Sequence, residues 1–124
     1  MQLRDNIPGI AHPGVWGLFG GHIEVGESPL LALQRELVEE IGYDAPQLTE
    51  FYQDREATVI RHIFYGSLTV NLDQLSLNEG WDMGLVTRGE IKAGECYSQN
   101  AATTRPLGRP HQRILLDFME FTNK

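Results

Sequence analysis

The segment at residues 28–42, SPLLALQRELVEEIG, constrains the fold most because it carries helix signals at both of its ends. Ser28 can cap the amino end, Pro29 suits the first helical position, and Gly42 follows the last turn. Leucine and isoleucine side chains recur along one side of the segment at helical spacing. We therefore expect a helix here, with its apolar side packed on a sheet.

The rest of the chain is predicted to consist mainly of strands. Short apolar or alternating runs predict strands at residues 1–4, 15–19, 47–55, 58–70 and 81–87. We expect a short helical turn near residues 88–92, a loop through residues 98–110, and a structural terminal helix over residues 111–121. This order indicates an α+β or a layered α/β/α domain, and 124 residues leave room for one domain over residues 1–124.

Composition limits the partners and the location of the chain. A formal net charge of −7 disfavours duplex nucleic acid, whose phosphates need cationic side chains. No apolar run approaches the roughly 20 residues that span a bilayer, so we expect no membrane partner. Cys96 is the only cysteine and cannot form an internal disulfide, which favours a reducing, cytoplasmic location. The negative net charge does not exclude an anionic small molecule as a ligand, because a bound divalent metal can reverse the local electric field.

Three glutamates, Glu36, Glu39 and Glu40, stand on one side of the predicted helix at i, i+3 and i+4. Like charges at these spacings repel by about 0.2–0.5 kcal/mol per pair, and acids near the carboxyl end oppose the helix dipole. A solvated acidic face is the plain interpretation. The alternative is a site for Mg²⁺ or Mn²⁺, which prefer carboxylate oxygens and would remove both penalties.

The glycine-rich segment before the helix, LFGGHIEVGES, supplies Gly20, Gly21 and Gly26, followed by Glu27. Glycine lets a backbone approach a ligand closely, although a plain strand–turn–helix connection would look the same. The segment leads directly into the acidic helix. Residues 21–43 together read G-x5-E-x7-R-E-L-x-E-E-x-G-Y.

This pattern resembles the Nudix box, G-x5-E-x7-R-E-U-x-E-E-x-G-U, where U is a bulky hydrophobic residue. Tyr43 is the one departure, at a position where an aliphatic residue is usual. The resemblance implies a Nudix-type α/β/α sandwich with a mixed sheet. Nudix domains have a full strand before the segment that reads QLRD here, so the first strand looks truncated. We expect a homodimer partner or the carboxy-terminal region to cover the resulting sheet edge.

The resemblance also implies roles for individual residues. The metal ligands would be the carboxylates of Glu36, Glu39 and Glu40 with the backbone carbonyl of Gly20. Glu27 would hold Arg35, which orients those carboxylates. A later loop, LNEGWDMG, resembles the one that adds a further glutamate in many Nudix enzymes. That glutamate would be Glu79, with Asp82 a weaker candidate and an exposed loop acid the alternative interpretation.

The implied activity is hydrolysis of a phosphoanhydride bond in a nucleoside diphosphate linked to another moiety, with Mg²⁺ or Mn²⁺ required. Arg35 is one catalytic candidate, and Glu36, Glu40 and Glu79 are all candidates for the general base. The chain lacks the downstream proline and tyrosine typical of ADP-ribose and diadenosine polyphosphate hydrolases. We therefore favour a (deoxy)nucleoside triphosphate as substrate over a nucleotide sugar.

Other interpretations stay open at this point. Trp16, Phe19 and Tyr43 could stack a base, although aromatics often fill core. Phosphates could be met by Arg61, Arg105 and Arg109, although arginines are often solvated. A Nudix-like nucleotide-binding regulator without catalysis is a rival function, but such proteins usually have damaged boxes. A calcium-binding structural domain is a second rival, and the chain lacks a calcium-loop pattern.

Overall fold

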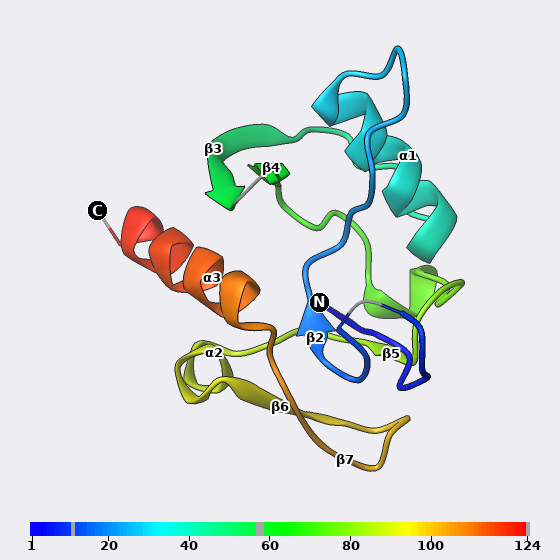
Figure 1. The fold of residues 1–124 in the computed structure, drawn as a ribbon, viewed down its shortest axis with the longest axis vertical. Coiled ribbons are helices and arrows are strands. Elements are labelled where there is room, and N and C mark those ends of the chain that lie inside the picture. Colours follow the sequence, from blue (N-terminus) through cyan, green and yellow to red (C-terminus); the bar gives the residue numbers. More distant parts are fainter. Residues whose placement is uncertain (11, 57–58, 124) are drawn as a thin grey trace. The chain divides into compact units, whose positions relative to one another are not determined.

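The structure is a computed structural model that describes residues 1–10, 12–56 and 59–123 (Figure 1). Their contacts divide the chain into two compact units, and each is described separately. Unit 1 comprises Met1–Leu18 and Glu79–Lys124, and unit 2 comprises Phe19–Asn78. No helix among the described residues is both long enough and apolar enough to cross a bilayer.

Unit 1 contains a short sheet, a hairpin and two helices. Its elements are β1 (Gln2–Leu3), β2 (Trp16–Gly17), β5 (Asp82–Met83), α2 (Arg88–Ala93), β6 (Glu95–Ser98), β7 (Thr103–Pro106) and α3 (Arg109–Thr122). The sheet has the antiparallel order β2-β1-β5, so both sides of β1 are paired within this chain. An isolated parallel bridge joins Trp16 to Leu107. The dimer expected to cover a sheet edge stays a prediction.

The core of unit 1 is built around Trp16, which is only 2% exposed and packs with Leu3, Ile91, Cys96 and Leu107. The indole Nε1 donates a hydrogen bond to the Cys96 carbonyl oxygen at 3.0 Å, so the one polar atom of the ring is satisfied inside the core. The structure therefore favours the core interpretation of Trp16. Its ring is not exposed for stacking on a base.

The loop predicted through residues 98–110 is wrong, because β6 and β7 form an antiparallel hairpin and α3 begins at Arg109. Burial alternates along β6, where Cys96 and Ser98 are buried while Tyr97 is exposed. The Ser98 hydroxyl is fully buried, donates to Asp82 Oδ2 at 2.6 Å and accepts from the Ala101 amide at 3.0 Å. Ser98 is a polar residue at a buried position of β6, so the sequence lacks the apolar alternation that would have predicted the strand.

Unit 2 contains α1 (Pro29–Ile41), the antiparallel strands β3 (Thr49–Glu56) and β4 (Val59–Tyr65), and a 3-10 helix, η1 (Leu72–Gln74). The predicted strand over residues 58–70 is thus shorter, and its residue 58 lies outside the described residues. The predicted caps of α1 are confirmed. The Ser28 side chain accepts from the Leu31 amide at 3.2 Å, and Gly42 is left-handed with φ 66°. Helices and strands together confirm the α/β class.

The segment after η1 returns to the carboxyl end of α1. The Ser76 and Asn78 amides donate to the carbonyl oxygens of Ile41 and Glu40, both at 2.9 Å. These bonds satisfy carbonyls that a helix end leaves without an intrahelical partner. The last turn of α1, which carries two of the glutamates, is therefore fixed by main-chain contacts.

Candidate metal-binding site on helix α1

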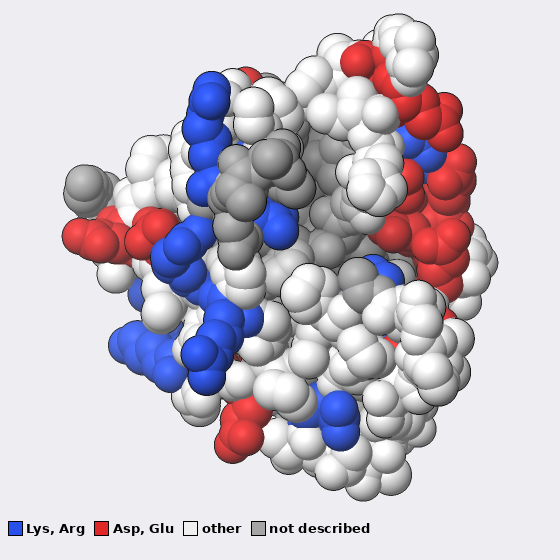
Figure 2. Space-filling model, viewed as in Figure 1, with Lys and Arg blue, Asp and Glu red and all other residues white. Residues whose placement is uncertain are grey.

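Acidic side chains gather on one face of unit 2. In Figure 2 they form a patch at the upper right, with a small basic area among them. The patch is formed by α1 and by the loop that precedes it. Its glutamates are Glu24, Glu27, Glu36 and Glu39, which lie 2.8–3.9 Å from the Arg35 guanidinium, whereas Glu40 on the same helix is buried.

Arg35 organises this patch through its guanidinium group. Its Nε and Nη2 form a fork on the two Glu27 oxygens at 2.8 and 3.0 Å. Its Nη1 donates to Glu36 at 3.0 Å and lies 3.3–3.4 Å from the Glu39 oxygens, while Nη2 also donates to the His22 carbonyl at 3.1 Å. Hydrogen bonding to Glu27 is the main cause that raises the pKa of Arg35, so the group stays charged.

Glu27 is held from a second side by a turn in the preceding loop. Its Oε1 accepts from the Glu24 amide at 2.9 Å, and its own amide donates to the Glu24 carbonyl at 3.0 Å. The Arg35 hydrogen bonds, followed by this backbone contact, lower the pKa of Glu27. Glu24 was not singled out from the sequence, although its carboxylate lies 3.9 Å from Arg35 Nη1. Its spacing of three residues from Glu27, typical of a tight turn, was the available signal.

Gly20, directly before the box, and Gly21, its first residue, are required for different reasons. Gly20 has φ 147°, a backbone conformation that side chains disfavour. Gly21 is needed for space, because a Cβ there would lie 2.5 Å from Glu36 Oε1 and 2.7 Å from its Cδ. The loop backbone and the Glu36 carboxylate are therefore in direct contact.

The substitution Gly21→Ala is expected to displace the Glu36 carboxylate while leaving the fold nearly unchanged. The added methyl group would collide with the Glu36 carboxylate, which is the flexible end of a side chain. Unit 2 can therefore accommodate the methyl group by a movement of that carboxylate. We expect about 10-fold weaker Mn²⁺ binding, the scale typical of a misplaced metal ligand. Calorimetric titration with Mn²⁺ and a melting curve would measure both effects.

The matched control is Gly84→Ala, which adds the same methyl group where nothing lies within 4 Å and φ is not positive. Equal Mn²⁺ affinities for the two alanine variants would contradict the role of Gly21 as a support for Glu36.

The three helix glutamates differ in their surroundings. Glu40 is 4% exposed, whereas the Glu39 side chain is 52% exposed. Over residues 1–10, 12–56 and 59–123, no group of three or more acidic, histidine or cysteine side chains is arranged to hold a metal. Glu36 and Glu39 instead contact Arg35. The donor chemistry fits a hard divalent cation, because a carboxylate that contacts Arg35 keeps further oxygen lone pairs for such a cation.

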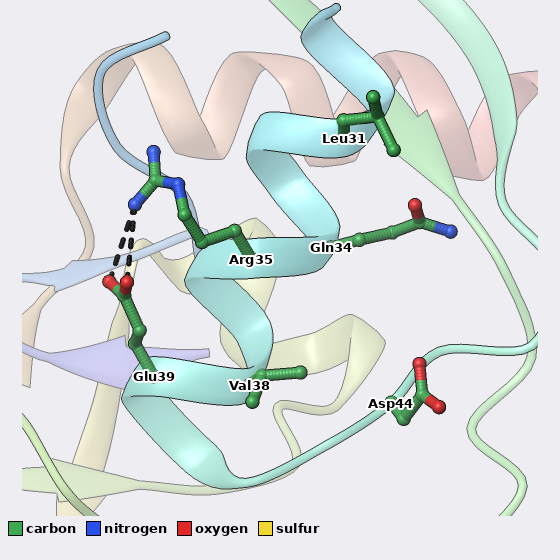
Figure 3. A pocket seen from close by; sticks show the side chains of 6 residues that line it. All are labelled: Leu31, Gln34, Arg35, Val38, Glu39 and Asp44. Atoms are coloured by element: carbon green, nitrogen blue, oxygen red, sulfur yellow. Dashed lines mark hydrogen bonds and ion pairs between the residues drawn. The ribbon is translucent and has the colours of Figure 1, made fainter. Parts of the chain in front are cut away.

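A shallow depression of about 480 Å³ lies beside α1 and is lined by Arg35 and Glu39 together with four other residues. In Figure 3, Arg35 and Glu39 point to one side of the helix, joined by their ion pair, while Gln34 points to the other side. The depression borders the acidic patch. It is open and lined by few groups, so it is not a formed substrate pocket.

The other predicted site residues are placed as follows. Glu79 is an exposed residue of unit 1 whose carbonyl accepts from Gln2 Nε2 at 2.9 Å, and its metal-binding role stays a prediction. The Asp82 carboxylate accepts hydrogen bonds from the Ser98 hydroxyl and from the Met83 amide. These contacts give Asp82 a role in the structure of unit 1. Phe19 and Arg61 are half-buried residues of unit 2, and Arg61 lies on β4.

Comparisons with known proteins assign the chain to a family. A family model described as NUDIX domain matches residues 3–117, which include residues of both units. A protein of Bacillus subtilis (strain 168) named "Putative 8-oxo-dGTP diphosphatase" is 39% identical over 57 residues, which cover 44% of this chain and 38% of that relative. No solved structure matches the chain. Because the family model covers most of its residues, the chain belongs to the Nudix family.

Proposed function

We propose that this chain hydrolyses a phosphoanhydride bond in a (deoxy)nucleoside triphosphate and requires Mg²⁺ or Mn²⁺. The observation that carries the proposal is the acidic patch of unit 2, in which Arg35 is fixed by Glu27 and contacts Glu36 and Glu39. Family membership supports the reaction class. The proposed ligands are the Glu36, Glu39 and Glu40 carboxylates and the Gly20 carbonyl, all of unit 2. Glu79 stays a further candidate that rests on the resemblance to the Nudix box alone.

In the proposed reaction, the residues of the chain position the metal-binding carboxylates and supply a general base. When bound, a divalent metal neutralises charge on the diphosphate oxygens and lowers the pKa of an attacking water. Arg35 holds Glu36 and Glu39 at defined positions before the substrate arrives. One carboxylate, from Glu36, Glu40 or Glu79, then accepts a proton from the water. No serine or cysteine nucleophile is needed.

The relative's name supports a nucleoside triphosphate as the substrate class. It describes a diphosphatase for an oxidised deoxyguanosine triphosphate, and the identity to that protein is 39% over the matched residues. The match covers 38% of that protein, so the base that this chain prefers is part of the proposal. We propose dGTP and its 8-oxo form as the first substrates to compare.

The test is pyrophosphate release from a nucleotide panel, with Mg²⁺, with Mn²⁺ and with excess EDTA. The panel contains the four deoxynucleoside triphosphates, 8-oxo-dGTP and ADP-ribose. We expect metal-dependent pyrophosphate release from at least one triphosphate, its loss in EDTA, and its recovery when metal is added back.

Two outcomes would overturn the proposal. Metal-dependent cleavage of ADP-ribose alone, measured as release of AMP, would move the function to a nucleotide-sugar pyrophosphatase. Nucleotide binding without turnover under every metal condition would instead identify a Nudix-like regulator.

A further inference from the structure

Tyr43 is the residue at which this chain departs from the usual Nudix box, and the structure gives its hydroxyl a set of partners. The side chain is 8% exposed and directly follows Gly42, the left-handed cap of α1. The Tyr43 amide donates to the Leu37 carbonyl at 3.2 Å. Its backbone is therefore part of the helix end, and its ring is held there.

The Tyr43 hydroxyl makes three contacts with one exposed loop. It accepts a hydrogen bond from the Thr69 amide at 3.1 Å, lies 2.8 Å from Thr69 Oγ1, and donates to the Ser67 carbonyl at 3.4 Å. A phenol has one proton and two lone pairs. All three contacts form together when the Thr69 hydroxyl donates to the tyrosine oxygen.

These contacts anchor a segment that we name the strap, residues 66–78. Its first part, residues 66–69, is exposed and forms no helix or strand. Its last part returns to α1, where the Ser76 and Asn78 amides bond to the Ile41 and Glu40 carbonyls. The hydroxyl thus holds the beginning of the strap, and main-chain bonds hold its end at the same helix terminus.

The end of the strap is adjacent to residues of the proposed site. Asn78 binds the main chain of Glu40, which is a proposed metal ligand and 4% exposed. Asn78 also directly precedes Glu79 in the sequence. Movement of the strap would therefore change the support of one proposed ligand and the chain that leads into another.

We propose that Tyr43 is a positioning residue, whose hydroxyl holds the strap against the carboxyl end of α1 and so maintains the metal-binding geometry of the glutamates. The inference rests on the proposed function. An aliphatic residue at position 43 would fill similar buried space but could not bind Thr69 or Ser67. This chain uses a polar contact where the common form of the box has only packing.

The test uses three variants of the full chain. Tyr43→Phe keeps the ring and removes the hydroxyl, Thr69→Val removes the opposing hydroxyl, and the double variant measures their coupling. Tyr97→Phe is the matched control, because Tyr97 is 57% exposed and belongs to unit 1. Mn²⁺ affinity by calorimetry, hydrogen exchange at the Asn78 amide, kcat, KM and melting temperature are measured for each.

We expect Tyr43→Phe to bind Mn²⁺ about 3- to 10-fold more weakly than wild type, the scale of one lost hydrogen bond that supports a ligand. Exchange at Asn78 should become faster, and kcat should fall more than KM rises. The double variant should lose little more than either single variant. Tyr97→Phe should match wild type.

Faster exchange at Asn78 with unchanged Mn²⁺ affinity and kcat would show a merely structural contact and overturn the inference. Additive losses in the double variant would also overturn it, and Thr69→Val supplies the test if Tyr43→Phe does not fold. Wild-type chain that binds no Mn²⁺ would overturn the proposed function and this inference together. Wild-type binding with no difference in any variant would overturn this inference alone.

Discussion

Replacing Glu40 with glutamine is expected to lower kcat by about 10²- to 10⁴-fold, the range associated with losing a general base or a metal ligand. Glu40 is the most buried of the three helix glutamates, at 4% exposure, and its carbonyl is held by the Asn78 amide. Glutamine keeps the size and one oxygen of the side chain but removes the negative charge. The substitution therefore removes the chemistry of the group with little change in shape.

Pyrophosphate release, Mn²⁺ calorimetry and a melting curve would be measured on this variant. Glu120→Gln is the matched control, because Glu120 is an exposed acid of helix α3 in unit 1 and lies outside both the acidic patch and residues 66–78. Removing its charge should leave kcat within about twofold of wild type, as expected for a surface substitution. A Glu40→Gln enzyme with wild-type kcat and Mn²⁺ affinity would exclude Glu40 from the site.

Replacing Arg35 with alanine is expected to weaken Mn²⁺ binding by about 10- to 100-fold, the usual cost of losing a group that orients metal ligands. The guanidinium forms a fork on Glu27 and contacts Glu36 and Glu39, so its loss leaves all three carboxylates without their shared partner. The net negative charge of the patch would increase. A loss of affinity would show that the orientation of the carboxylates outweighs the added negative charge, because charge alone would attract the metal.

Arg35→Lys separates charge from geometry. Lysine keeps the positive charge but cannot form the two parallel hydrogen bonds on Glu27. We expect its Mn²⁺ affinity to fall between those of wild type and Arg35→Ala. If Arg35→Ala bound Mn²⁺ as tightly as wild type, the guanidinium would be dispensable for ligand placement, and its contacts would serve the fold only.

Local signals in the sequence were sufficient to predict α1 and both of its ends. Ser28, Pro29 and Gly42 determine the ends of the helix through hydrogen bonds and backbone angles within a few residues. The ion pair between Arg35 and Glu39 follows from their spacing of four residues on a helix. Such features depend on neighbours along the chain, so they can be predicted without the tertiary fold.

Long-range contacts were not predictable in the same way. Trp16 was a candidate for base stacking, yet it is core, because Cys96 and Leu107, distant in the sequence, enclose it. Strand β7 and the turn before it were predicted as part of a loop over residues 98–110, since Ser98 is polar, although its hydroxyl is buried and bonded to Asp82 and to the Ala101 amide.

The sequence by itself determined the acidic helix, its caps and its resemblance to the Nudix box, because each is encoded by residues within 23 consecutive positions, 21–43. Only the tertiary structure decided that Glu36 lies against the Gly21 backbone and that Tyr43 holds Thr69. The physical reason is that space and hydrogen-bond partners come from segments brought together by folding, and spacing along one chain does not specify them.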